Sequence, residues 1–227
     1  MITTLLEDLA RTSYPTIGHL LEEGFVDPGI GSLMGHVPGG VKIAGPAVTV
    51  RIADRDAIAM NRALLALRPG DVLVVDMLGD NRHAPVGAVT AAAAIAQGAA
   101  AVVVDGVATD VRELREAGLP VFARGTSCLT TKRLRGAGSA VNVPVHCGGV
   151  QVNPGNIVLG DDNGLIVLAP EAAREVLPRA LAPTRPSPPS WPASRPGNRS
   201  NRSLPCNTTG ARAATCCATS ELGPGMG

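Results

Sequence analysis

Residues 71–125 alternate apolar, strand-like runs with helical segments, and this pattern constrains the fold of the chain more than any other feature. DVLVVDM (71–77) is almost continuously apolar, and AAVVVDG (100–106) and LPVFARG (119–125) have the same character. Between them lie an alanine-rich helical segment at 88–98 and the amphipathic segment DVRELREAG at 110–118. Short, glycine-marked connections between such elements favour right-handed crossovers. We therefore expect a sheet that is at least partly parallel and buried on both faces.

The segments before residue 71 predict two further helical regions and a strand. Leucine and isoleucine at helical spacing predict two helices within 3–24, divided at Pro15 because proline interrupts a helix. Residues 41–52 alternate as a strand does, and Gly45-Pro46 predicts a bulge or bend within it. The pattern of residues 55–67 predicts a helix that leads into the buried strand.

The second half of the chain changes character. After residue 138, glycine, asparagine and aspartate turn signals separate short β-branched runs, which predicts hairpins or a small β-layer. A last helix is expected at 171–181. We therefore predict one α/β domain over residues 1–181, a mixed α/β/β sandwich with a β-rich second half. Residues 182–227 are rich in Pro, Ser, Asn and Arg without apolar periodicity, and we expect them to be a disordered tail.

Charge, hydropathy and cysteine usage narrow the class of protein. A formal net charge of +1 provides no field that favours a nucleic-acid partner. No stretch approaches the roughly 18 apolar residues that a membrane span needs, and no secretion signal is recognised, so a cytoplasmic location is expected. The five cysteines are odd in number and show no Cys-x-x-Cys spacing, so we expect free thiols.

The carboxyl ends of parallel strands are where ligands gather, and two such junctions carry polar residues. The first runs from Asp76 to Val89 and contains Arg82 and His83 before it reaches Gly87. A histidine in a crevice can carry out acid–base chemistry near pH 7, although a loop histidine is more often a surface residue.

The backbone N–H groups at the start of the alanine-rich helix offer an anion site. The amides of Gly87, Ala88, Val89 and Thr90 could hold a carboxylate or phosphate, since a helix N-terminus favours negative charge. The second junction ends at Asp110. Its carboxylate could cap the following helix, which is the commoner local role, or bind Mg²⁺ largely through water.

The combined segments are similar to those of a known family. AGPAVTV, RPGDVLVVD, AAAAIAQGAAAVVVDG, TDVRELREAGLPVFARGTS and VNVPVHCGGVQVNPGNIVLGDDNGLIVL, in this order, resemble the RraA-like family. That family includes the 4-hydroxy-4-methyl-2-oxoglutarate aldolases and the regulator of RNase E activity, and it carries the old name demethylmenaquinone methyltransferase. The resemblance extends over about residues 5–180 and not into the tail.

The resemblance implies a homotrimer, or a dimer of trimers, with sites at subunit interfaces. It also implies a class II aldolase that depends on a divalent metal, Mg²⁺ or Mn²⁺, cleaves a small 2-oxo acid and can decarboxylate oxaloacetate. The family's motif is a glycine, an acidic or amide residue, a twenty-residue spacer and Arg-Asp. Gly87 and Asp110 match it, with Asp110 as the implied metal ligand. Ala88 stands where the acid is expected, and Thr109 replaces the substrate-binding arginine.

These departures leave three hypotheses open. The first is a metal-dependent lyase in which Arg82 or His83 compensates for the missing groups; Arg124 and Lys132 are further cations that could enter the pocket. The second is a non-catalytic regulatory or binding protein on the same scaffold. The third is an enzyme of the family that acts on a different anionic substrate.

Overall fold

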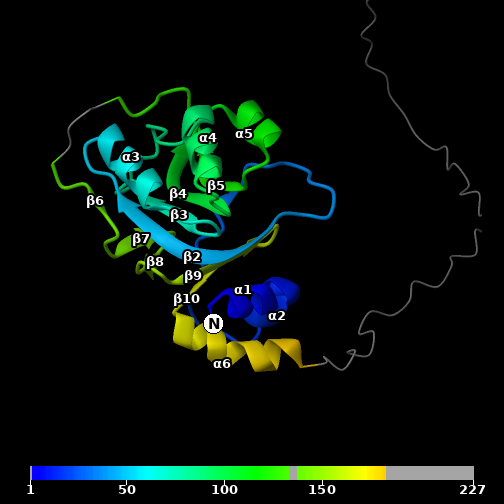
Figure 1. The fold of residues 1–227 in the computed structure, drawn as a ribbon. Coiled ribbons are helices and arrows are strands. Elements are labelled where there is room, and N and C mark those ends of the chain that lie inside the picture. Colours follow the sequence, from blue (N-terminus) through cyan, green and yellow to red (C-terminus); the bar gives the residue numbers. More distant parts are fainter. Residues whose placement is uncertain (1, 133–136, 183–227) are drawn as a thin grey trace, which may run out of the picture. The chain divides into compact units, whose positions relative to one another are not determined.

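Eight strands form one mixed sheet in the described part of the protein, residues 2–132 and 137–182 of the computed structural model (Figure 1). The sheet order is β1-β5-β4-β3-β2-β9-β10 with β6 paired to β2, while β7 and β8 form a separate hairpin. Apart from Ala182, the predicted tail lies outside the described residues. The strands are β1 (Gly31–Ser32), β2 (Lys42–Arg51), β3 (Val72–Asp76), β4 (Ala101–Ala108), β5 (Val121–Thr126), β6 (Ala140–Val141), β7 (Val145–Cys147), β8 (Val150–Val152), β9 (Ile157–Asp161) and β10 (Gly164–Leu168).

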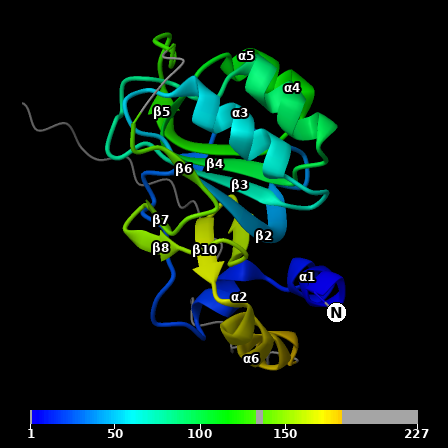
Figure 2. The ribbon, with the colours of Figure 1, turned by 60° about the vertical axis from the view of Figure 1, so that its left-hand side comes forward.

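The helices lie in two groups on this sheet (Figures 1 and 2). Three of them cover the parallel strands, and the others gather beside β9 and β10 at the opposite side of the molecule. None of the helices in the described ranges is long and apolar enough to cross a membrane. The helices are α1 (Ile2–Arg11), α2 (Tyr14–Gly18), α3 (Ala57–Ala66), α4 (Ala88–Ala96), α5 (Val111–Ala117) and α6 (Pro170–Leu181).

The central strands confirm the predicted parallel sheet. β2, β3, β4 and β5 pair in parallel in chain order, and α3, α4 and α5 connect them in turn. Successive crossovers of one hand that step in one direction place their helices on the same face, as Figure 2 shows. All residues of β3 are buried, as its continuous apolar run predicts.

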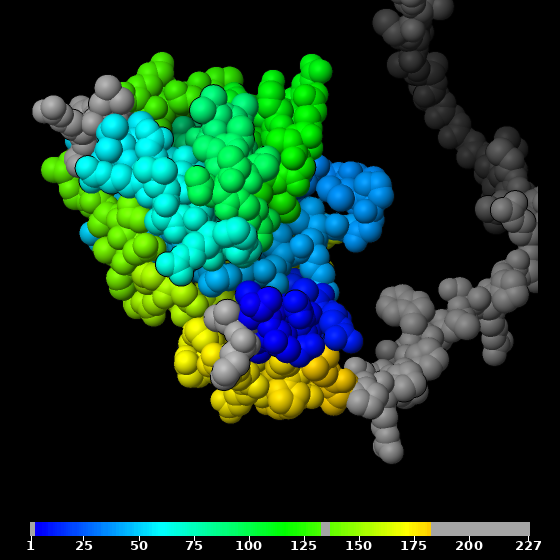
Figure 3. All heavy atoms as spheres, viewed as in Figure 1, coloured from blue at the N-terminus to red at the C-terminus, as the bar shows by residue number. Residues whose placement is uncertain are grey.

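Successive side chains of each strand point to opposite faces of the sheet, so the apolar core is divided into a cluster on each face. In β3, Leu73 and Val75 pack under α3, α4 and α5, whereas Val72 and Val74 belong to a second cluster with the β7–β8 hairpin. Each such side chain stabilises the fold by about 1.5–3 kcal/mol on full burial. A third cluster joins α1, α2 and α6 to β9 and β10, and the space-filling view shows these helices in direct contact (Figure 3).

The break between the first two helices does not lie at Pro15, so this prediction is wrong. The chain leaves helical structure at Thr12-Ser13, and Pro15 lies in the first turn of α2. Proline is well tolerated there because the first N–H groups of a helix have no acceptor within the helix. Pro15 therefore begins the second helix and does not end the first.

The predicted bulge or bend at Gly45-Pro46 is a change of pairing partner. Residues 42–46 of β2 pair with β9 without a register shift, and residues 47–51 pair with β3. A Cβ atom on Gly45 would meet the carbonyl oxygen of Gly70, so glycine allows the close approach of two backbones there. β2 is thus shared by the parallel part of the sheet and the β9–β10 hairpin.

The β-rich second half contains the two predicted hairpins. β7 and β8 are joined by Gly148 and Gly149, both with positive φ, as a tight turn between antiparallel strands requires. β9 and β10 form the second hairpin, and α6 then closes the described chain.

Candidate functional site

The start of α4 and the end of β4 meet at the carboxyl edge of the parallel strands. Val86 and Ala108 form a parallel bridge, and the N–H of Thr109 donates to the carbonyl of Val86 over 2.9 Å. These contacts fasten the loop that follows β3 to the segment that follows β4. As a result Gly87, at the N-terminus of α4, lies beside Asp110.

The carboxylate of Asp110 binds to α4 and makes no side-chain cap of its own helix, α5. Its Oδ2 accepts a hydrogen bond from the N–H of Ala88 (2.9 Å), and its Oδ1 accepts one from the Thr109 hydroxyl (3.1 Å). The residue itself is left-handed, with φ 55° and ψ 41°. The alternative of an ordinary cap for α5 is therefore wrong. The negative charge lies at the N-terminal end of α4, where the helix dipole favours it.

Gly87 leaves the space that this contact needs. A Cβ atom there would lie 2.5 Å from Asp110 Oδ2 and 2.7 Å from the Cγ2 methyl of Thr109. The glycine is in extended backbone (φ −150°), so the requirement concerns space and not backbone strain. Any larger residue would push the carboxylate away from the N–H of Ala88.

A cavity of about 250 Å³ opens beside these groups. Of the predicted site residues it is lined by Gly87, Val89, Thr90, Thr109 and Asp110. Ala88 contributes through its N–H to Asp110. The structure thus brings together the predicted amide segment, the threonine at the arginine position and the predicted metal ligand.

Three polar residues of the same cavity were not predicted. Asn61 comes from α3, and Thr130 and Thr131 come from the segment after β5. Ala84 forms a parallel bridge with Thr130, and its carbonyl accepts from the N–H of Thr131 over 3.1 Å, which fixes this segment at the cavity. Contacts between such distant segments leave no local signal in the sequence. Asp110 is the only charged residue in the described lining, which is otherwise hydroxyl, amide and apolar groups.

Arg82 and His83 do not line this cavity. His83 Nδ1 lies 2.7 Å from Asp80 Oδ2, and Asp80 Oδ1 accepts from the N–H groups of Arg82 (2.8 Å) and His83 (3.1 Å). Burial alone would raise the pKa of Asp80, but these hydrogen bonds outweigh it, so the pKa lies below its ordinary value. An ionised Asp80 would orient the His83 ring and favour the proton on Nδ1.

The two other cations considered from the sequence differ in their availability. Arg124 is held between Asp105 and Asp27, and the hydrogen bonds that its guanidinium donates to these carboxylates raise its pKa. It is therefore committed to this ion-pair network. Lys132 is exposed and directly follows Thr131, which lines the cavity.

The carboxylates that end β3 and β4 hold the β7–β8 hairpin. Asp76 accepts from the N–H of His146 over 3.1 Å, and Asp105 accepts from the N–H of Gly148 over 2.8 Å. These contacts place Asp76 and Asp105 in a structural role, although the sequence marks them as the starts of functional junctions. Cys147, between the two amides, is a free, buried thiol, as expected.

The donor set at Asp110 is compatible with a magnesium-type cation. The described residues contain no group of three or more His, Cys, Asp or Glu side chains that could enclose a metal. Mg²⁺ is commonly bound through one or two carboxylates, with water and substrate oxygens completing its shell. Asp110 offers one carboxylate, and each of its oxygens retains acceptor capacity beyond the one hydrogen bond that it makes.

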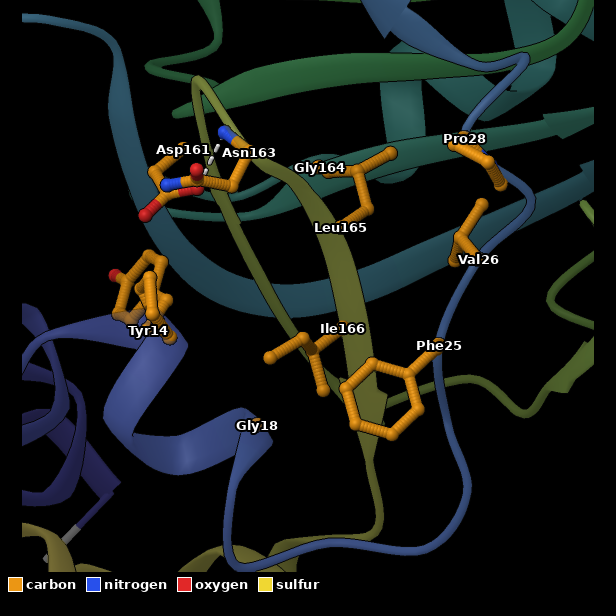
Figure 4. A pocket seen from close by; sticks show the side chains of 11 residues that line it. Tyr14, Gly18, Phe25, Val26, Pro28, Asp161, Asn163, Gly164, Leu165 and Ile166 are labelled. Carbon is orange, nitrogen blue, oxygen red and sulfur yellow. Dashed lines mark hydrogen bonds between the residues drawn. The ribbon is translucent and has the colours of Figure 1, made fainter. Parts of the chain in front are cut away.

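A second cavity of about 250 Å³ has a different character (Figure 4). Tyr14 and Gly18 of α2, Phe25 and the β9–β10 hairpin surround it. The hydroxyl of Tyr14 donates to the carbonyl of Ile43, and the backbone N–H of Asn163 donates to Asp161. We place the candidate site at Asp110 because its cavity combines a carboxylate, several hydroxyl groups and a helix N-terminus.

The fold and this cavity define a class of protein: a mixed α/β domain with a single carboxylate held at a helix N-terminus beside an open polar pocket. Comparison with known proteins identifies the family. The chain belongs to the RraA-like family, described as Aldolase/RraA, whose model matches residues 22–167. This match confirms the resemblance inferred from the sequence segments.

Individual relatives carry two kinds of name. A protein of Halalkalibacterium halodurans named "Putative 4-hydroxy-4-methyl-2-oxoglutarate aldolase" is 37% identical over 139 residues, 61% of this chain and 65% of that protein. The chain therefore matches just under two thirds of that relative's length. The structure of Streptomyces coelicolor RraAS2, described as an unusual member of the RNase ES inhibitor RraA family, has a TM-score of 0.66 and 29% identity. It covers 78% of this chain and 90% of its own.

A second solved structure supports the same fold. The RNA-processing inhibitor RraA from Thermus thermophilis has a TM-score of 0.59 and 30% identity, over 70% of this chain and 93% of its own. The mixed α/β architecture with a β-rich second half, predicted from the sequence, is confirmed by these neighbours.

Proposed function

We propose that this protein is a lyase that cleaves or decarboxylates a small 2-oxo acid with the help of a divalent cation held by Asp110. One observation carries the proposal. The carboxylate of Asp110 lies at the N-terminus of α4, in a cavity lined by the residues that correspond to the family's motif. The names of relatives such as the one from Halalkalibacterium halodurans support this class of reaction.

In this proposal one group of residues would hold the cation and another would bind the carboxylate of the substrate. The N–H of Ala88 and the hydroxyl of Thr109 fix the Asp110 carboxylate, which would hold Mg²⁺ or Mn²⁺. A cation there would supply Lewis-acid polarisation of the 2-oxo group. The N–H groups of Val89 and Thr90, in the first turn of α4, would bind the substrate carboxylate, since the first amides of a helix have no acceptor within it.

Thr109 makes this site weaker in positive charge than the family's motif implies. A neutral hydroxyl in place of a guanidinium removes charge-assisted hydrogen bonds worth about 1.5–3 kcal/mol each. We propose that His83, oriented by Asp80, and Arg82 take part in its place, because both lie in the loop that continues into Ala84 and Pro85 at the cavity wall. Because neither residue lines the cavity, the side chains of His83 and Arg82 would have to move towards it when substrate binds.

The test is pyruvate release from oxaloacetate and from 4-hydroxy-4-methyl-2-oxoglutarate, with Mg²⁺ or Mn²⁺, for the full chain. We expect metal-dependent turnover that falls at least a hundredfold in Asp110→Ala, because the cation loses its protein ligand. Asp8→Ala, at a half-buried aspartate of α1, is the matched control and should keep full activity. Turnover no higher than that of the metal alone would exclude the lyase.

The second candidate is a regulatory protein that binds a partner and catalyses nothing. The structural similarity to proteins described as RNA-processing inhibitors favours it. Oxalate binding that requires Mn²⁺ and is lost in Asp110→Ala, without turnover of either substrate, would favour the third hypothesis, an enzyme with a different anionic substrate. Absence of both turnover and this Mn²⁺-dependent binding would favour the regulator.

A further inference from the structure

A third cavity, of about 260 Å³, lies where β2 and β3 end. Arg55 and Asp54, which follow β2, line it together with Leu78 and Asp80, which follow β3. Ala57, two residues after Arg55, lines the cavity of Asp110, so both cavities meet the start of α3. None of the residues that line the cavity at Arg55 also lines that of Asp110.

Arg55 is a half-buried cation without a counter-ion among the residues that the structure describes. Its guanidinium makes no hydrogen bond or ion pair with any of them, whereas Arg112, Arg124 and Arg174 each have a carboxylate partner. Partial removal of a charge from water is unfavourable unless an opposite charge or hydrogen-bond acceptors replace the lost solvation. A ligand with negative charge would provide that replacement.

None of the acidic residues around Arg55 forms an ion pair with it, although Asp54 and Asp80 line the same cavity. Asp80 accepts hydrogen bonds from two backbone N–H groups and lies against the His83 ring. Asp56 caps α3 by accepting from the N–H groups of Ile58 and Ala59. Asp54 is itself engaged in an interaction. The guanidinium of Arg55 therefore has no ion-pair partner among the described residues and can pair with a group that enters the cavity.

The backbone around this cavity is held in an unfavourable conformation. Asp54, Arg55 and Leu78 are all left-handed, with φ of 54°, 62° and 53°. Such conformations are unfavourable for non-glycine residues and tend to collect where a site needs a fixed geometry. All three of these residues line the cavity.

We infer that the cavity at Arg55 is an anion site that takes the phosphate or carboxylate group of a small molecule. The guanidinium would pair with two oxygens of such a group, as its planar, two-pronged donor arrangement allows. The inference goes beyond the proposed function and does not depend on it, because it concerns different residues and needs no metal. Phosphate and carboxylate share the chemistry that Arg55 recognises, and the choice between them is a matter for the experiment.

The test is calorimetric titration of the full, metal-free chain with inorganic phosphate and, separately, with oxalate. We expect saturable binding of at least one of them, with an affinity that falls at least tenfold in Arg55→Gln and less in Arg55→Lys. Arg112→Gln, at an exposed arginine paired with Glu116 on α5, is the matched control and should bind as the wild type does. Stronger binding of phosphate would identify a phosphorylated ligand, and stronger binding of oxalate a carboxylic acid.

Two further variants separate this site from folding and from the Asp110 cavity. Arg55→Gly should raise the midpoint of thermal unfolding, because glycine adopts a positive φ without strain, yet it should lose the anion. Asp110→Ala should still bind it. Absence of saturable binding, binding that survives both Arg55→Gln and Arg55→Gly, or binding that disappears in Asp110→Ala would each overturn the inference, whatever the outcome for lyase activity.

Discussion

The side chain of Asp110 bonds to α4 and not to α5 because the residue itself is left-handed. A residue that caps its own helix normally has extended backbone, which directs its side chain back to the helix's first N–H groups. In the left-handed conformation the side chain of Asp110 points across to Ala88, which lies 22 residues earlier in the chain. The order of residues 109 and 110 alone could not distinguish the two arrangements.

Gly87→Ala tests whether this arrangement carries the activity. The new methyl group would overlap Asp110 Oδ2 and displace the carboxylate from the N–H of Ala88, so we expect kcat/KM to fall about a hundredfold, as a misplacement of about 1 Å can cause. The backbone at Gly87 suits alanine, so circular dichroism and the midpoint of thermal unfolding should change little. Gly125→Ala, in β5 and facing open space, is the control. Wild-type kinetics in Gly87→Ala would contradict the assignment.

At the scale of elements, the sequence predicts the helices and strands, whose apolar residues recur at regular spacing. It does not predict the contacts that a residue makes with a distant segment of the chain. The parallel strands and their helices follow from apolar runs and glycine-marked ends, which are local properties. The role of Gly45 depends on the carbonyl of Gly70, and those of Asp76 and Asp105 depend on the amides of the β7–β8 hairpin. These contacts arise only when the sheet has assembled, so no pattern within one segment could predict them.

Asp80 accepts hydrogen bonds from its neighbours in the loop between β3 and α4. The stability that these bonds contribute should therefore depend on pH. The folded pKa of Asp80 lies below its ordinary value, so its ionised form contributes stability above about pH 4 and loses it as the pH falls through the folded pKa. Asp80→Asn should therefore lower the free energy of unfolding at pH 7 by about 1 kcal/mol, and this difference should shrink towards pH 3. Urea unfolding at both pH values measures it.

The comparison variant for Asp80 is Asp8→Asn in α1, whose carboxylate lies 3.5 Å from the exposed Arg11. A surface pair of this kind contributes little, so Asp8→Asn should have almost no effect at either pH. A destabilisation by Asp80→Asn that is equally large at pH 7 and pH 3 would show that the ionised form is not what organises the loop.

At the scale of the whole molecule, the candidate site collects residues from α3, α4, the end of β4 and the segment after β5. The spacing of the family's motif identified Gly87, Thr109 and Asp110 in advance, because it relates residues that the fold brings together although they lie far apart in the sequence. Asn61, Thr130 and Thr131 belong to no such motif, and their place in the cavity becomes visible only in three dimensions. The same holds for the cavity of Arg55, which depends on the backbone conformation of three separate residues.

Large apolar side chains are exposed around this carboxyl edge of the sheet, and we propose that they are covered by other copies of the chain. Val89 lines the Asp110 cavity with 85% of its surface exposed, Leu78 lines the Arg55 cavity at 58%, and Leu129 is 40% exposed beside Ala84. Isolated exposed apolar residues are ordinary, but a group of them beside a site is typical of an interface. This agrees with the homotrimer, or dimer of trimers, that the family resemblance implies.

Light scattering after size-exclusion chromatography should therefore give a molar mass of three or six times the 23.0 kDa of one chain. The double variant Val89→Gln and Leu129→Gln should lower that mass at micromolar concentration, because glutamine replaces apolar surface that the interface would bury. Leu65→Gln is the control, since Leu65 is 77% exposed near the end of α3 that is remote from Ala57 and the cavity. A wild-type mass of 23.0 kDa would contradict the assembly, and a double variant that assembles like the wild type would move the interface away from this edge.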